Sequence, residues 1–217
     1  MTWVLANLDL IGGLTASHVA IAVPAIVASL LISVPLGWWA HRNRVARSLL
    51  LTSTGIAYAL PSLPLFVVLP AILGTRILDP LNLVVALALY GVALLVRTAT
   101  EAFDAVGGDL RDAAAAVGHS PAQRFWRVDL PLAGPPLLAG LRVVSASTLS
   151  LVSVGALIGV PSLGTLFTDG YLRSFLTEIV VGLAGTVALA VVFDLVIVYG
   201  GRLVMPWVRA TDVRRGA

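Results

Sequence analysis

The feature that most constrains the fold is a set of long stretches without charged residues. From Leu10 to His41 the chain contains no Asp, Glu, Lys or Arg. A helix needs about 20 apolar residues to cross a bilayer core of about 30 Å. Of the 217 residues, 59% are hydrophobic and 12% are charged, whereas soluble domains are about a quarter charged. The sequence therefore predicts an all-α integral membrane protein.

Five transmembrane helices are expected within a single domain, residues 1–217. They are predicted at approximately 18–40, 48–73, 81–97, 133–160 and 177–204. A signal peptide is the alternative for the first segment, but no basic region precedes it and its apolar run exceeds the roughly 7–15 residues of such peptides. Pro61, Pro64 and Pro70 interrupt the second segment. Pro61 and Pro64 either line a pathway or bend a packed helix, and the carbonyls that they free must be satisfied by protein or water.

Arginine placement predicts the orientation, because basic residues gather in cytoplasmic loops. Eleven arginines fall on one side of the predicted membrane: Arg42, Arg44, Arg47, Arg97, Arg111, Arg124, Arg127, Arg202, Arg209, Arg214 and Arg215. Arg76 and Arg173 fall on the other side. We therefore expect the N-terminus outside and the C-terminus in the cytoplasm. The net charge of +3 then reflects topology and not a nucleic-acid surface.

Several kinds of chemistry are excluded by composition. Cysteine is absent, which excludes disulfides and thiolate catalysis, and lysine is absent, which excludes a P-loop lysine and Schiff bases. His18, His41 and His119 show no metal-ligand spacing. We expect no catalytic residue, metal or cofactor in this chain. Trp38 and Trp39, together with Trp207, fall near predicted span ends, as membrane-interface residues do.

A polar segment, residues 98–131, separates the third and fourth spans. Nine charges lie between Arg97 and Asp129. Residues 97–117 suit a helix that Gly118 ends, because glycine adopts the left-handed conformation without penalty. Ser120, Pro121 and Gln123 then suit the start of a second helix with a capping box. Pro131, Pro135 and Pro136 are expected to end this second helix and begin the fourth span.

An aromatic pair stands out in the polar segment. Phe125 and Trp126 lie between Arg124 and Arg127, a composition typical of protein–protein anchors. Resting on the membrane surface is the alternative. Gly118 likewise is either a functional corner or simply a helix stop.

Arg142 and Asp194 are the charges predicted inside the bilayer, where an unpaired charge is costly. We hypothesise that they pair between the fourth and fifth spans, as a structural pair or as a gate. Small polar residues cluster nearby: Ser145, Ser147, Thr148, Ser150 and Ser153. They serve helix packing or substrate contact, and Ser150 and Ser153 join Pro61 and Pro64 as possible pathway residues.

The polar segment resembles a known motif. Asp112-Ala113-Ala114, Gly118, nine further residues and then Val128-Asp129-Leu130-Pro131 are similar to the EAA loop of ABC importer permeases, E-A-A-x-x-x-G followed by I-x-L-P. Residues 59–74 resemble the proline-rich second span of the osmoprotectant permeases for glycine betaine, carnitine and choline. Residues 153–167 resemble their A-x-I-G-A-G-G-L-G stretch, with Val160-Pro161-Ser162 as a departure.

This resemblance implies a binding-protein-dependent importer in the prokaryotic cytoplasmic membrane. The chain would pair with a second, identical or paralogous permease and with two ATPase subunits that hold ATP and Mg²⁺. An extracytoplasmic binding protein would deliver a compatible solute such as glycine betaine, choline, carnitine or proline. The lipid bilayer is a partner and nucleic acid is not. The coupling residues implied are Asp112, Ala113, Ala114, Gly118, Ser120, Pro121, Arg124, Phe125, Trp126, Leu130 and Pro131. The alternatives are a permease for another small solute (an amino acid, phosphonate or sugar) and an intramembrane enzyme.

Overall fold

The computed structural model describes residues 2–207, and every regular element in that range is helical. The elements are α1 (Thr2–Ala6), α2 (Leu8–Arg42), α3 (Arg44–Ala59), α4 (Ser62–Leu73), α5 (Pro80–Asp104), α6 (Gly108–Ala116), α7 (Pro121–Arg124), a π-helical turn η1 (Phe125–Asp129), α8 (Leu130–Val154), a 3₁₀ turn η2 (Gly155–Ile158), α9 (Gly164–Leu172) and α10 (Leu176–Val204). The predicted all-α class is confirmed. Arg209, Arg214 and Arg215, which entered the orientation argument, lie outside the described residues.

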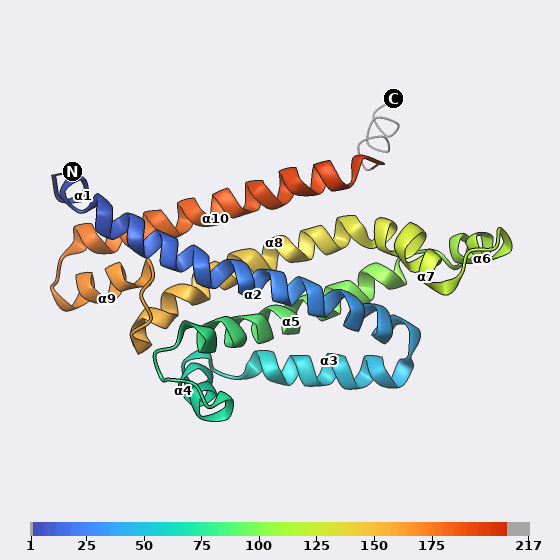
Figure 1. The fold of residues 1–217 in the computed structure, drawn as a ribbon, viewed down its shortest axis with the longest axis horizontal. Coiled ribbons are helices and arrows are strands. Elements are labelled where there is room, and N and C mark those ends of the chain that lie inside the picture. Colours follow the sequence, from blue (N-terminus) through green and yellow to red (C-terminus); the bar gives the residue numbers. More distant parts are fainter. Residues whose placement is uncertain (1, 208–217) are drawn as a thin grey trace.

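Helix α5 forms the centre of the bundle, packed between α2 and α8 (Figure 1). Its Leu83, Leu87 and Leu95 are fully buried. Helix α10 differs: it packs mainly on α8 and α9, and most of its large apolar side chains are exposed, Val191 and Val196 among them. Many exposed apolar side chains along one helix mark a surface that faces lipid or protein, so the helix suits such an environment.

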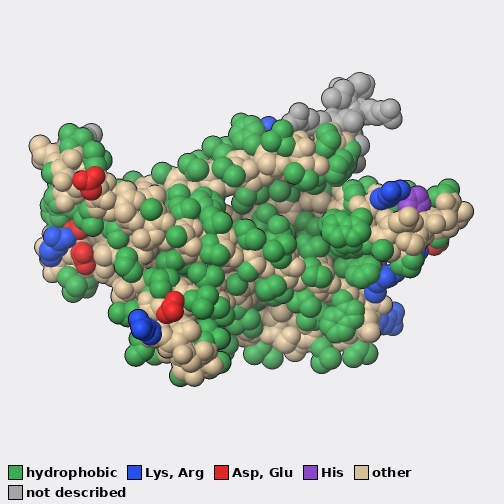
Figure 2. All heavy atoms as spheres, in the orientation of Figure 1, with side chains coloured by type: hydrophobic (Ala, Val, Ile, Leu, Met, Phe, Trp, Pro, Cys, Tyr) green, Lys and Arg blue, Asp and Glu red, His purple; other side chains and the backbone are tan. Residues whose placement is uncertain are grey.

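Charged side chains gather at the two ends of the elongated bundle, and the visible face between them is largely hydrophobic (Figure 2). One end carries α6 and α7, which project beyond the other helices; we call it the loop end. The opposite end carries α9 and the N-terminal helix α1 (Figure 1). This distribution suits a protein with a hydrocarbon-facing middle and two polar surfaces.

Four of the described helical segments are long and apolar enough to cross a membrane: Leu8–Arg42, Pro80–Asp104, Pro121–Ile158 and Leu176–Val204. The fifth candidate is the pair α3–α4, which bends by 107°. Helix α2 begins well before the expected residue 18 and runs through Gly12 and Gly13. Its Leu14 is buried against Leu163 and Leu166, and such packing outweighs the weak helix propensity of glycine.

The bend between α3 and α4 lies at Leu60 and Pro61, which are both extended. Proline disfavours the helical conformation in the preceding residue, so the helix ends at Ala59. Tyr90 Oη donates a hydrogen bond to the Leu60 carbonyl at 2.6 Å. A protein hydroxyl therefore satisfies this carbonyl of the broken helix. Pro64, by contrast, lies in the first turn of α4, where proline is tolerated.

Candidate functional site

The loop end is built around a sharp corner at Gly118. Its φ is +88°, a left-handed conformation that favours glycine. The corner is closed by backbone hydrogen bonds from Gly118 N–H to the Ala115 carbonyl, 2.9 Å, and from His119 N–H to the Ala114 carbonyl, 3.0 Å. No atom lies within 4 Å of a Cβ added at Gly118. The requirement for glycine therefore comes from the backbone alone.

The second helix of the loop begins with the capping box predicted from sequence. Ser120 Oγ accepts a hydrogen bond from Gln123 N–H at 3.3 Å, and Gln123 Oε1 accepts one from Ser120 N–H at 2.8 Å. Pro121 occupies the first turn, where its missing N–H is not needed. The start of α7 is therefore fixed by its own local sequence.

The predicted end of this second helix is wrong. Helix α7 passes through the π-turn η1 directly into α8, so residues 121–158 form one continuous helical segment. In the π-turn the Leu130 N–H bonds to the Phe125 carbonyl, five residues back. Pro131 follows in the first turn of α8, and Pro135 and Pro136 lie inside that helix. A wide π-turn re-routes the hydrogen bonds locally, so the helix continues where prolines alone predict a stop.

The predicted single helix over residues 97–117 is also wrong. Helix α5 ends at Asp104 and α6 begins at Gly108. Gly107 between them is extended, and a pair of glycines weakens a helix because glycine loses the most backbone entropy on ordering. Helix α6 is thereby free to project from the bundle.

The two aromatic residues of the loop differ in exposure, although their rings are in edge contact with centroids 5.0 Å apart. Phe125 packs edge to face on Trp38 of α2, with ring centroids 5.0 Å apart, and lies 6.1 Å from the Phe103 ring of α5. Trp126 is 66% exposed. Only Trp126 is therefore available as an anchor, while Phe125 holds the loop to the bundle. Trp38, expected near a membrane interface, lies beneath the loop.

The motif residues of α6 and the helix that follows also divide by exposure. Asp112 and Ala113 are exposed, whereas Ala114 is buried. Leu130 packs, with Phe125, against a cluster of buried residues at the base of the loop: Ala99, Ala102, Phe103, Val106, Ala133 and Leu137. Arg124 and Pro131 are half-buried. The loop thus has one face sealed on the bundle and one face free.

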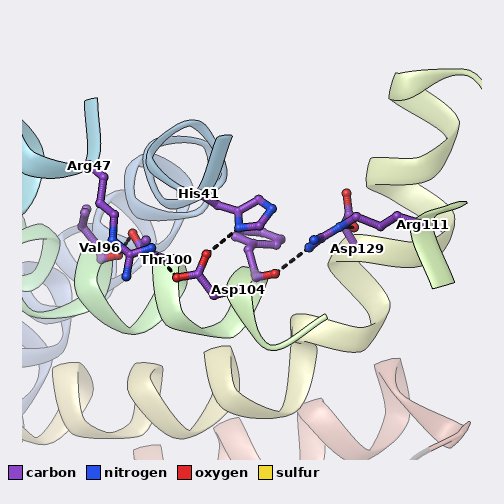
Figure 3. Close-up of polar contacts among 8 residues, drawn as sticks. His41, Arg47, Val96, Thr100, Asp104, Arg111 and Asp129 are labelled. Carbon is purple, nitrogen blue, oxygen red and sulfur yellow. Dashed lines mark hydrogen bonds and ion pairs between the residues drawn. The ribbon is translucent and has the colours of Figure 1, made fainter. Parts of the chain in front are cut away.

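Arg111 braces the base of the loop. Its Nε donates to Asp129 Oδ1 at 2.7 Å, and its Nη2 donates to the Phe103 carbonyl at 2.5 Å (Figure 3). The two side chains are only 19% and 8% exposed. One guanidinium therefore links α5, α6 and η1, and charge-assisted hydrogen bonds are strong where water is excluded.

A second ionic cluster ties the first corner of the bundle to the end of α5. His41 Nδ1 lies 2.6 Å from Asp104 Oδ1, and Arg47 binds the other oxygen of the same carboxylate (Figure 3). His41 belongs to α2 and Arg47 to α3. The loop therefore projects from a base in which α2, α3 and α5 are cross-linked by charge, next to the Arg111–Asp129 pair.

The structure brings together the two charges predicted inside the bilayer. Arg142 on α8 donates to Asp194 on α10 from Nε at 2.5 Å and from Nη2 at 2.9 Å. This parallel arrangement is the bidentate geometry that guanidinium and carboxylate favour. The side chains are 46% and 39% exposed. Among the possible pathway residues, Pro61, Pro64 and Ser150 are exposed and Ser153 is half-buried, and they do not share a contact with this pair.

Comparison with known proteins decides the family. The sequence model of the binding-protein-dependent transport system inner membrane component matches residues 29–210. The chain belongs to this family.

Relatives of this inner membrane component include transport permeases. This chain is 29% identical to the osmoprotectant import permease protein OsmW of Salmonella typhimurium over 88% of this chain and 90% of that protein. It is 28% identical to the choline transport system permease protein OpuBB of Bacillus subtilis, over 88% and 87%. A 33% identical relative is the ergothioneine transport permease/ergothioneine binding protein EgtU of Helicobacter pylori; the match covers 70% of this chain but spans only 27% of that protein.

Solved structures share the fold. An inward-facing structure of the MetNI methionine ABC transporter superposes with a TM-score of 0.75 at 19% identity, covering 94% of this chain and 98% of the other. An amino acid ABC transporter structure gives 0.75 at 14% identity, covering 93% and 97%. The multi-pass helical fold is thus that of ABC transporter membrane components.

Sequence reasoning missed several residues that shape this site. Arg111 entered only as a topological charge, and Asp129 as the variable position of the motif. At the opposite end, Glu178 is fully buried and accepts two hydrogen bonds from Arg173, at 2.5 and 2.6 Å. Acidic residues close to arginines were the available signal, but it does not say which of them meet in the fold.

Proposed function

We propose that this chain is the permease subunit of an ATP-driven importer for a compatible solute such as glycine betaine, choline, carnitine or proline. Family membership and the names of relatives such as OsmW and OpuBB support the assignment. The subunit lies in a prokaryotic cytoplasmic membrane with its N-terminus outside and its loop end in the cytoplasm, in agreement with the arginine distribution.

The loop end is the proposed docking element for the ATPase. The observation that carries this proposal is the exposed Trp126 on a helix that Arg111 and Gly118 hold in one geometry. A rigid aromatic projection with one free face fits a cleft in a partner. ATP-driven closure of two ATPase subunits would displace two such loops, one from each permease chain, and rock the spans between two arrangements. ATP and Mg²⁺ bind the partner, and this chain carries out no covalent chemistry.

The experiment isolates the chain from its native membrane in mild detergent and identifies the subunits that co-purify. We expect an ATPase, a binding protein and a second permease chain. Trp126→Ala is expected to lose the ATPase, whereas Tyr171→Ala is expected to retain it. Tyr171 is the matched control, because it is an aromatic residue 77% exposed at the opposite end. Full retention of the ATPase by Trp126→Ala would contradict the docking assignment.

The transported solute is identified by its stimulation of ATP hydrolysis. Glycine betaine, choline, carnitine, proline and ergothioneine are each added with the binding protein, and ATP hydrolysis is measured in the reconstituted transporter. We expect a quaternary ammonium solute to stimulate hydrolysis. Methionine, a phosphonate and a sugar are added in parallel, and stimulation only by one of these would keep the transporter and replace its substrate class. Turnover of a substrate without an ATPase would instead favour the enzyme alternative.

A further inference from the structure

A groove between α8 and α10 contains the Arg142–Asp194 pair. Its volume is about 320 Å³, and its walls include Arg142, Ser145, Ala146, Val187, Ala190 and Asp194. Pockets that bind small molecules begin at roughly 300 Å³. The groove therefore has room for a small solute.

The two charges in this groove lie at the middle of the membrane-spanning segment. Arg142 is the central residue of α8, Leu130–Val154, so the pair lies far from either end of the span. The side chains are nevertheless 46% and 39% exposed. An ion pair that is exposed to hydrocarbon at this depth is costly, so the groove suits a polar occupant.

The other walls supply complementary chemistry. Ser145 Oγ is buried beside the pair and has no hydrogen-bond partner among the described residues, although buried polar groups are normally paired. Ala146, Val187 and Ala190 form apolar walls. The groove thus combines a cation, an anion and surfaces that suit methyl groups, with the buried Ser145 hydroxyl behind them.

We propose that the groove binds a zwitterion that carries a carboxylate and a methylated quaternary ammonium. Its carboxylate takes the place of Asp194 on the Arg142 guanidinium, which matches a carboxylate in bidentate fashion. Its ammonium lies beside the released Asp194 carboxylate. A quaternary nitrogen has no N–H to satisfy, and its methyl groups contact the apolar walls. The net charge in the membrane remains zero in both states.

The solute class in this proposal rests on the proposed function, whereas the groove and its charges come from the structure. The exchange also gives the intramembrane pair a role beyond holding two helices together. In this structure Asp194 binds Arg142, and in the proposal the carboxylate of the solute displaces it. A solute that has only the ammonium lacks the group that competes for Arg142.

The test uses single cysteines, because the natural chain has none. Ala146→Cys places a thiol in the groove, and Val143→Cys is the control, since Val143 is 61% exposed on α8 but does not line the groove. The assembled transporter in liposomes is treated with a trimethylammonium-ethyl methanethiosulfonate, which is membrane-impermeant. We expect Ala146→Cys to react and Val143→Cys to be inert.

Protection of the introduced thiol from labelling tests which solute binds in the groove. Glycine betaine at roughly ten times its dissociation constant should slow labelling of Ala146→Cys about tenfold, because about a tenth of the sites stay free. Choline, which lacks a carboxylate, should protect less. In the Ala146→Cys background, Arg142→Gln/Asp194→Asn should keep the labelling and lose the protection. Arg142→Lys, which keeps the charge but not the planar fork, should weaken protection and serves if the neutral pair fails to assemble.

Three results would overturn the proposal. An inert Ala146→Cys means that lipid or protein fills the groove, and a disulfide between two copies at position 146 would identify a second chain. Equal labelling of Ala146→Cys and Val143→Cys means that the groove is no more accessible to water than the rest of the α8 surface. Equal protection with and without the charged pair means that the pair does not bind the solute. Binding-protein-stimulated ATP hydrolysis on the same preparation reports the proposed function separately: hydrolysis without protection overturns the groove alone.

Discussion

Two arginine–aspartate pairs in this chain share the same chemistry and lie in opposite settings. Arg111–Asp129 lies at the polar base of the loop with side chains 19% and 8% exposed. Arg142–Asp194 lies at mid-helix in an otherwise apolar region, with side chains 46% and 39% exposed. The first pair is thus buried although it lies at a polar end of the molecule, and the second is exposed although it lies in the apolar middle.

The difference in burial suggests two roles: the first pair holds elements of the fold together, and the second can exchange its partners. Arg111 also holds a backbone carbonyl, so removing either partner leaves a buried group without compensation. The Arg142–Asp194 pair bonds only within itself among the described side chains, so its two members are free to accept other partners. The first pair therefore suits a fixed element, and the second suits a site that changes occupant.

The largest expected effect is that of Arg111→Ala. The substitution leaves the buried Asp129 carboxylate and the Phe103 carbonyl unpaired, which costs about 3–5 kcal/mol. Unfolding titrated with sodium dodecyl sulfate in mixed micelles measures the loss. Arg127→Ala removes an exposed arginine of the same loop and should stay within about 0.5 kcal/mol. Equal losses of stability in the two variants would show that Arg111 contributes no more than an exposed arginine.

A smaller effect is expected at the corner that Arg111 supports. Gly118→Val should cost about 1–2 kcal/mol or more, because a β-branched residue must adopt the left-handed conformation. Gly118→Asn should cost less, since Asn tolerates that region. We expect the Val variant to insert into the membrane but to hydrolyse ATP without uptake. Wild-type uptake by Gly118→Val would show that the corner does not transmit motion.

Ser120→Ala should be milder still. It removes the side-chain acceptor of the capping box, a loss of about 1 kcal/mol, and is measured by the same unfolding titration. Thr54→Ala is a suitable control, since this hydroxyl bonds only to backbone carbonyls inside α3. If the two variants are equally stable, the cap does not hold the start of α7.

The smallest loss of stability is expected for the double variant Arg142→Met/Asp194→Leu. It leaves no unpaired charge in the membrane, so it should fold better than either Arg142→Ala or Asp194→Ala alone, and the single losses should exceed the double loss when summed. Solute uptake should nevertheless be lost. Normal uptake by this double variant would make the mid-helix pair a structural one, like the pair at the loop.

Features set by neighbouring residues could be predicted from the sequence. The capping box at Ser120 and the positive φ of Gly118 depend on local backbone chemistry, and both are confirmed. The α5–α6 break at Gly107 and Gly108 was also local and was overlooked, although a glycine pair is a recognised loop signal. The pairing of Arg142 with Asp194 was reachable because few charges lie in the spans.

The rest depended on geometry that the sequence does not display. The π-turn at Phe125–Asp129 adds a residue to one turn of helix, which shifts the helical phase of the residues that follow it. His41 and Asp104 are 63 positions apart, and Arg111 and Asp129 are 18 apart. Only the packing of α2 against α5 and the return of η1 to the base select these partners among many possible ones.

The uninterrupted run from α7 through the π-turn into α8 has a mechanical consequence. Trp126 and Arg142 lie 16 positions apart on this one helical segment, about 24 Å at 1.5 Å per residue. A displacement of Trp126 by the proposed ATPase partner would therefore be carried along this segment to Arg142, so that the docking element and the proposed solute groove belong to one mechanical unit.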